Sequence, residues 1–211
     1  MTTISHHIPD SMLAAYAAGT LPAPFALVIA THVSMCSDCR ASLEAHHVAG
    51  GVVLEDCAPA SLSSDLKANV LDMLDQPFDD VPRPKRSGIY PGPVMEQLKG
   101  KPPRWKPLGG GVKQTILSSS DEGSARLLFI PAGQAVPDHG HNGLELTLVL
   151  QGSFSDDTGY FGTGDLEVAD EDLEHIPIAG AGLPCICLAA TDAPLRFNSL
   201  VPRLLQPIFR I

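Results

Sequence analysis

The sequence predicts an α+β protein of two domains, a small all-α domain of four helices followed by an all-β barrel. Three observations favour this fold class. Apolar residues stand at helical spacing in the first third of the chain, a run rich in proline follows, and short apolar runs separated by Gly, Pro and Asp fill the remainder. We therefore expect a helical domain at residues 1–76, a linker at residues 77–104 and a barrel at residues 105–211.

The composition limits the classes of function. The chain has 211 residues, near the length at which one domain becomes two, and its 44% apolar and 18% charged content is typical of a folded protein. A formal net charge of −10 argues against direct binding of nucleic acid or of an anionic membrane, and it favours a basic protein partner. The longest apolar run, Leu21–Ala30, contains prolines and is shorter than the roughly 20 residues of a membrane span. Because Met1–Pro9 does not read as a signal peptide, we expect a soluble, cytoplasmic protein.

Four segments have the apolar spacing of helices: Met12–Ala18, Phe25–Met35, Ala41–Ala49 and Leu62–Leu74. Asp10 is expected to cap the first helix, and Gly19 to end it. The third helix is expected to end at Gly50 and Gly51. The fourth places its apolar side chains on one face: Leu66, Val70, Met73 and Leu74.

Prolines predict the linker, and short apolar runs separated by turn residues predict the strands. Seven prolines between residues 77 and 104 exclude a regular helix there and favour a semi-extended linker, in which the basic residues Arg83–Arg86 are expected to be solvated. From Trp105 onward the turn residues recur about every ten positions, which is typical of a β-sandwich or barrel. The expected strands lie at Arg126–Ile130, Leu144–Leu150, Gly152–Phe154, Leu166–Val168, Cys185–Ala189 and Leu195–Phe197.

A first metal site is predicted at the end of the second helix. His32 and Cys36 are four residues apart and share a helix face, and Cys39 follows at a spacing that suits a turn. Zn²⁺ prefers four such ligands in a tetrahedron, so a fourth must come from elsewhere, with His7 as the leading candidate and His6 as the alternative. A closed site of this kind is structural, and zinc binding contributes about 10–16 kcal/mol in zinc peptides.

Other interpretations of the cysteines stay open. Cys36 and Cys39 could be a redox dithiol, although no βαβ pattern surrounds them, or ordinary core residues. The total of five cysteines is odd and unevenly spaced, which disfavours a secreted disulfide scaffold. Cys57 is expected to pack as a small apolar residue. Cys185 and Cys187 share one face of a strand, where they form either an oxidation-sensitive pair or apolar filling.

A second metal site is predicted in the β region. His139 and His141 project to one face of an extended strand, Glu145 can return to that face, and His175 supplies a fourth ligand. Imidazole suits Zn, Fe, Ni and Cu, and the carboxylate adds Mn. Zinc is the preferred ion by association with the first site, whereas Fe or Mn with open positions would permit oxygen chemistry.

Both sites carry family resemblances. About the first 75 residues resemble the zinc-containing anti-sigma family, which places a histidine before a His-x-x-x-Cys-x-x-Cys motif. The spacing from Gly133 through His139, His141 and Glu145 to Gly152 resembles the first cupin motif at every position. The second cupin motif keeps its histidine, His175. It departs from the family pattern at Asp170, Asp172 and Ala179.

The combination resembles ChrR-type anti-sigma factors over the whole length. The resemblance is carried by the histidines near the start and by Ala14–Thr20, His32–Cys39, Gln134–Gly152 and Cys185–Ile211. It implies an anti-sigma factor, not an enzyme, whose helical domain holds an extracytoplasmic-function-type sigma factor of RNA polymerase. It also implies that a cupin barrel is needed for release under singlet oxygen-like stress. Two alternatives remain open: a metal-dependent cupin enzyme, such as a dioxygenase or isomerase, and a zinc-bridged adaptor without a switch.

Overall fold

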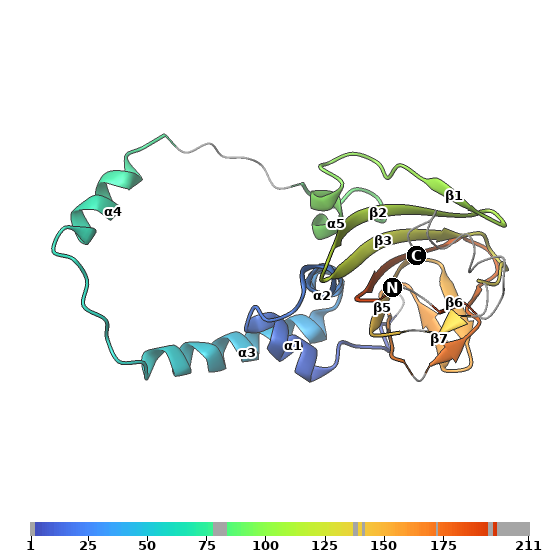
Figure 1. The fold of residues 1–211 in the computed structure, drawn as a ribbon, viewed down its shortest axis with the longest axis horizontal. Coiled ribbons are helices and arrows are strands. Elements are labelled where there is room, and N and C mark those ends of the chain that lie inside the picture. The colour runs from blue at the N-terminus through green and yellow to red at the C-terminus, as the bar shows by residue number, and fades with distance from the viewer. Residues whose placement is uncertain are drawn as a thin grey trace.

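The computed structural model describes residues 3–77, 84–136, 139–140, 142–171, 173–193 and 196–197, with the side chains of residues 139, 196 and 197 left aside. The helices are α1 (Asp10–Ala17), α2 (Ala23–Met35), α3 (Ser37–Glu55), α4 (Leu66–Leu74) and α5 (Gly92–Gln97). The strands are β1 (Lys106–Gly109), β2 (Val112–Ser120), β3 (Gly123–Ile130), β4 (His139–Gly140), β5 (Glu145–Gln151), β6 (Ser153–Asp156), β7 (Gly159–Gly162), β8 (Leu166–Ala169), β9 (Glu174–His175), β10 (Ile178–Ala179), β11 (Cys185–Thr191) and β12 (Arg196–Phe197). The expected order, helices before strands, is confirmed (Figure 1).

Several helix boundaries differ from the predictions: α2, α3 and α4 begin at Ala23, Ser37 and Leu66 rather than at Phe25, Ala41 and Leu62. Asp10 is the first residue of α1 rather than its cap, since Pro9 occupies the cap position without a side-chain hydrogen bond. The third helix does not end at Gly50 and Gly51 but continues to Glu55. Neither glycine has a positive φ, and a glycine inside a helix costs only about 1 kcal/mol relative to alanine. The end of α1 at Gly19, with φ of 69°, follows the prediction.

The helices do not form a four-helix bundle. Buried side chains of α1, α2 and the first turns of α3 share one core, but no residue of α4 is buried. Figure 1 shows α3 running away from the sheets and α4 standing apart from them. The helical region is therefore a small packed unit with an exposed extension.

A fifth helix lies where an extended linker was expected. Pro93 lies in the first turn of α5, where its missing N–H has no helical acceptor to lose, so proline does not prevent this helix. Val94 and Met95 are buried, and α5 contacts α2. The expectation that the prolines exclude a regular helix is therefore wrong for residues 92–97.

The strands form two facing layers and a short third sheet. The six-stranded sheet has the order β1-β2-β3-β11-β5-β8, the second sheet is β10-β6-β7, and the third is β12-β4-β9. One apolar cluster joins the first two sheets: Ile130, Val149, Phe154, Phe161, Ala179, Cys185 and Cys187. We call the side of the six-stranded sheet that carries Val149 and Cys187 its inner face. No closed sheet is formed by the strands in the described ranges.

The outer face of the same sheet is covered by helix α2. Phe25, Val28 and Ile29 of α2 are buried in one cluster with Leu127 of β3 and Leu188 of β11. The helical region and the β region therefore share a core, and α2 contributes to both.

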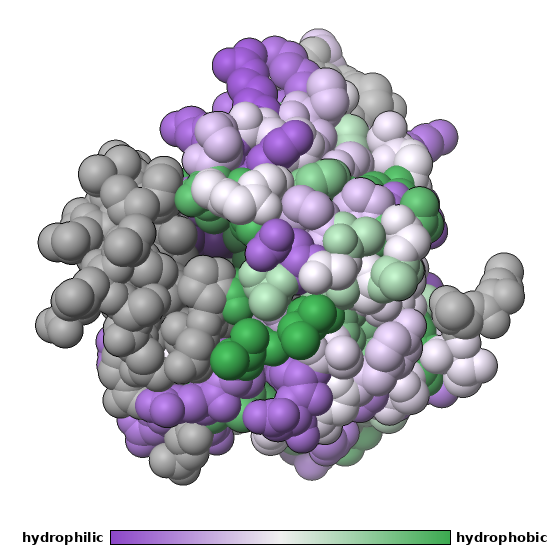
Figure 2. All heavy atoms as spheres, turned by 90° about the vertical axis from the view of Figure 1, so that its right-hand side faces the viewer, coloured by the Kyte–Doolittle hydropathy of each residue, from purple (hydrophilic) through white to green (hydrophobic). Residues whose placement is uncertain are grey.

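The face of the molecule away from the helices is mixed in polarity. Figure 2 shows polar side chains around a smaller group of apolar ones on this side. No helix within the described residues combines the length and the apolar character that crossing a bilayer requires.

Candidate metal centres

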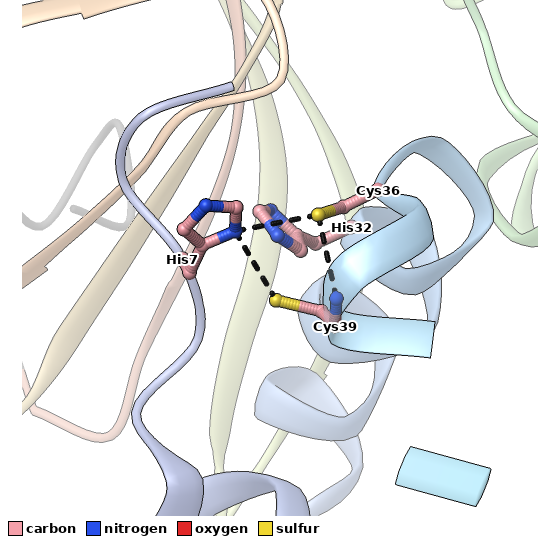
Figure 3. A group of neighbouring side chains, drawn as sticks. All are labelled: His7, His32, Cys36 and Cys39. Atoms are coloured by element: carbon pink, nitrogen blue, oxygen red, sulfur yellow. Dashed lines mark hydrogen bonds between the residues drawn. The ribbon is translucent and has the colours of Figure 1, made fainter. Parts of the chain in front are cut away.

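Four of the predicted ligands come together at the junction of α2 and α3. His32 lies in the last turn of α2, Cys36 links the two helices, Cys39 lies in the first turn of α3, and His7 comes from the segment before α1. Their ligand atoms all lie within 4.8 Å of one another (Figure 3). Nδ1 of His7 is 3.3 Å from the sulfur of Cys36 and 3.6 Å from that of Cys39. We call this group the Cys₂His₂ cluster.

The cluster is built so that a cation would complete it. His32 is fully buried, and neither of its ring nitrogens has a hydrogen-bond partner within the described residues. Burial, and next the neighbouring His7, lower the pKa of His32 to about 4, so the ring is a neutral ligand at pH 7. Burial raises the pKa of Cys39 to about 11, which keeps the thiol protonated unless a positive ion offsets the charge of the thiolate. A zinc ion fits these donors.

The two histidines near the N-terminus take different positions. His7 faces the cysteines, whereas the ring of His6 lies 4.4 Å from that of Phe161 and its Nδ1 lies 3.6 Å from the carboxylate of Asp165. Sequence spacing left this choice open, because both residues precede α1 at nearly the same distance from Cys36.

The second predicted set is described only in part. His141 lies outside the described residues, and the side chain of His139 is not described. The backbone of β4 pairs with β9 so that His139 is opposite His175. Glu145 begins β5 and accepts a hydrogen bond of 3.0 Å from the hydroxyl of Thr147, while His175 is buried. His139 and His175 are thus brought side by side in register.

Two acidic residues that the sequence analysis did not single out lie against His175. Nδ1 of His175 is 2.6 Å from Oδ2 of Asp156 and 3.5 Å from Oε1 of Glu167, so the three form a compact group. The other oxygen of Asp156 accepts hydrogen bonds from Thr158 and Gly159, which hold the carboxylate in place. The run Asp-Asp-Thr-Gly after β6 is a turn signal, and Glu167 interrupts an apolar strand, but neither feature points to His175.

Charge and burial act in opposite directions in this group. Burial raises the pKa of Asp156, but hydrogen bonds from Thr158, Glu167 and His175 outweigh it and hold the pKa at about 2. Burial lowers the pKa of His175, and the two carboxylates overcome that effect and raise it. For Glu167, burial dominates and raises the pKa. Asp156 therefore orients the imidazole of His175 through Nδ1.

The remaining cysteines have three environments. The sulfurs of Cys185 and Cys187 are 3.4 Å apart on the inner face and fully buried. Their mutual hydrogen bond and burial raise the pKa of Cys187 well above its usual value, and oxidation needs an exposed thiolate. Cys57 is exposed, with its sulfur 3.4 Å from the carbonyl of Val53, so the expectation that it packs in the core is wrong. It stands just beyond α3, where the chain has left the core.

Comparisons with known proteins agree on one family. A model of the ChrR cupin-like domain matches residues 98–193. The anti-sigma-E factor ChrR of Cereibacter sphaeroides is 54% identical over 212 residues, which cover 99% of this chain and 100% of that protein. A crystal structure of Rhodobacter sphaeroides SigE in complex with the anti-sigma ChrR matches with a TM-score of 0.81 and 52% identity, over 90% of this chain and 100% of that one. These relatives are regulators, which decides against the alternative of a cupin enzyme. The chain belongs to the ChrR family of anti-sigma factors.

Proposed function

We propose that this chain holds a sigma factor of RNA polymerase inactive through its helical region and releases it on oxidative stress of the singlet-oxygen type, sensed through its cupin region. The observation that carries the proposal is an apolar surface on the second half of α3 and on α4. Its members are exposed by 39% to 75%: Val48, Val52, Val53, Leu54, Leu66, Val70, Leu71, Met73 and Leu74.

This apolar surface needs a protein partner. Soluble proteins rarely expose so many large apolar side chains together without an interaction. A helix of nine residues with no buried side chain, as α4 is, has marginal stability in water by itself. Leu66, Val70 and Leu74 recur every four residues on one side of α4, the pattern by which a helix enters an apolar groove.

A sigma factor is the occupant that the comparisons favour. The related ChrR structure was determined with SigE bound, and it matches this chain at a TM-score of 0.81. The formal net charge of −10 suits a basic partner, because complementary charge speeds encounter. We expect this encounter to take place in the cytoplasm, where sigma factors meet RNA polymerase.

We further propose that His7, His32, Cys36 and Cys39 hold a structural zinc ion. The support is the closeness of the four ligand atoms, the unsatisfied ring nitrogens of His32 and the raised pKa of Cys39. Zinc would stabilise both cysteines as thiolates and fix the angle between α2 and α3. That angle sets the direction in which α3 carries its apolar surface.

For the cupin region we propose a divalent metal held by His139, His141, Glu145 and His175 inside a closed barrel. Charge on the inner face supports it. Glu145 and Glu167 lie there, Asp156 of β6 joins Glu167 at His175, and the described part holds one buried guanidinium among them, that of Arg126. A dication would balance the excess negative charge. Asp156 fits the role of the acceptor that orients a metal-binding histidine.

The division of labour between the parts stays a prediction. We propose that residues 1–76 bind the sigma factor, that residues 105–211 sense the stress, and that residues 77–104 connect them. Cys185 and Cys187 are candidates for the oxidised pair, since their sulfurs already lie 3.4 Å apart. Because both are buried, their oxidation would require the sheet to open locally.

A charge placed on the apolar surface tests the proposal. Val70→Asp buries an unpaired carboxylate in the expected interface and should weaken sigma-factor binding by about 2–4 kcal/mol, or roughly 30- to 1,000-fold. Ala68→Asp adds the same charge on the opposite side of α4 and is the matched control. A tagged chain is used to recover the sigma factor from its native lysate, and calorimetry then measures both variants against the purified partner. Failure to recover any sigma factor, or equal affinity of the two variants, would overturn the proposal.

A further inference from the structure

The segment that carries His7 is fixed by a carboxylate from the β region. Oδ1 of Asp165, in the turn between β7 and β8, accepts hydrogen bonds from the backbone N–H groups of Ser5, at 2.7 Å, and of His6, at 2.9 Å. Its other oxygen accepts from the N–H of Gly162 at 2.8 Å. The side chain of Asp165 is only 5% exposed. The buried carboxylate of Asp165 thus pairs three backbone donors, of which Ser5 is exposed and His6 and Gly162 are half-buried.

Further contacts hold the same segment against β8. The N–H of Leu166 donates to the carbonyl of His6 at 3.1 Å, which extends the backbone pairing past Asp165. Gly164 has a φ of +97°, and a Cβ built on it would lie 2.6 Å from the side chain of Ile4. The ring of His6 rests on Phe161. The N-terminal segment is thus seated closely on the β7–β8 turn.

The contact between the N-terminal segment and the β7–β8 turn affects the Cys₂His₂ cluster because His7 belongs to that segment. His32, Cys36 and Cys39 belong to α2, α3 and their junction, so the local fold positions them. His7 lies outside the helices and is the exposed member of the cluster. Buried Ile8 anchors it on one side, and Asp165 fixes the two residues on the other.

We propose that Asp165 is a positioning residue for the metal-ligating His7, so that the β region holds one ligand of the helical metal site in place. This inference rests on the proposed zinc ion at the Cys₂His₂ cluster.

The position of Asp165 also connects the two candidate metal centres. It precedes Glu167 by two residues, and Glu167 lies 3.5 Å from Nδ1 of His175. A displacement of β8 at the second centre would therefore shift the acceptor that holds Ser5 and His6 at the first. We expect zinc binding at the Cys₂His₂ cluster and events at His175 to influence each other to the extent that this shift occurs.

The test compares Asp165→Ala with Asp157→Ala in the full-length chain. Asp157 is an exposed residue of the preceding turn, and its replacement removes the same charge without touching the segment. Hydrogen–deuterium exchange measures the protection of the Ser5 and His6 backbone amides. The rate at which zinc passes to a coloured chelator measures how firmly the Cys₂His₂ cluster holds the ion. We expect Asp165→Ala to lose protection at both amides and to release zinc about tenfold faster. The control should behave as the wild type does.

A second variant and a metal analysis of the wild type make the result interpretable. Asp165→Asn retains one acceptor oxygen and serves if the alanine variant does not fold; it should give a smaller change in the same direction. Wild-type amide protection and zinc release in the folded Asp165 variant would overturn the inference. A wild-type chain that carries no zinc at the outset would overturn the proposed metal site instead, and metal analysis reveals this before the variants are compared.

Discussion

Replacing His32 by leucine separates a metal ligand from an ordinary buried histidine. Leucine has a similar volume and suits the apolar surroundings of α2, which include Val28 and Ile29. It removes both ring nitrogens, neither of which has a hydrogen-bond partner within the described residues. The two roles therefore predict changes of opposite sign in the free energy of unfolding.

The magnitudes follow from burial and from mass action. An unsatisfied buried polar group costs about 1–3 kcal/mol, so His32→Leu should stabilise the metal-free chain by about that amount. Free zinc at a thousand times its dissociation constant stabilises the wild type by about 4 kcal/mol, and loss of a ligand removes most of this. In zinc buffer the variant should therefore be less stable than the wild type by about 1–3 kcal/mol.

Thermal unfolding in zinc buffer and in excess chelator gives the answer. For a chain of this length each kcal/mol shifts the melting temperature by about 2–4 °C, so the two curves should exchange order between the conditions. Thr31→Val is the control, since Thr31 is equally buried and its hydroxyl donates to the carbonyl of Leu27. It should keep the zinc-dependent shift of the wild type. A His32→Leu chain that is more stable than the wild type in both conditions would refute the assignment of His32 as a ligand.

Two further predictions concern protonation and the second centre. The pKa of His32 is lowered from 6.5 to about 4, so the unfolded chain binds a proton that the folded chain excludes. In chelator, stability should be complete above pH 6.5 and fall by up to about 3 kcal/mol as the pH drops toward 4. Denaturant titrations should show this slope in the wild type and not in His32→Leu. Asp156→Asn presents an amide to Nδ1 of His175 and should lower divalent-metal affinity of the cupin region by about 10- to 100-fold, as dialysis and metal analysis would measure. Retention of metal equal to that of Asp157→Asn would contradict it.

Local geometry explains which parts of the site could be predicted. The spacing from His32 to Cys39 covers one helix end and the next helix start, so their convergence depends on few backbone angles. The choice between His6 and His7 depends instead on Asp165, far along the chain. Asp156, Glu167 and His175 come together from three separate strands, β6, β8 and β9. No sequence spacing encodes such an encounter.

The fold shows the same division between local and distant causes. Short apolar runs predicted β3, β5 and β11 because each strand buries one face against α2 and the other against the second sheet. The wrong predictions concern segments whose secondary structure depends on contacts with distant parts of the chain. Gly50 and Gly51 remain helical, at a cost of only about 1 kcal/mol each relative to alanine. Helix α5 forms where Val94 and Met95 are buried and the helix contacts α2. Proline content alone could not reveal that contact.

The shared position of α2 constrains how a signal could free a partner. Phe25, Val28 and Ile29 are almost completely buried against the sheet, and full exposure of each costs about 1.5–3 kcal/mol. Separating α2 from the sheet would thus cost about 5–9 kcal/mol, comparable to the whole stability of a domain. A coupling of 1–3 kcal/mol is enough to change affinity 5- to 150-fold. We therefore expect the sigma factor to be released while α2 stays packed on the sheet. A small shift at the β7–β8 turn would change the position of His7 and the direction of α3.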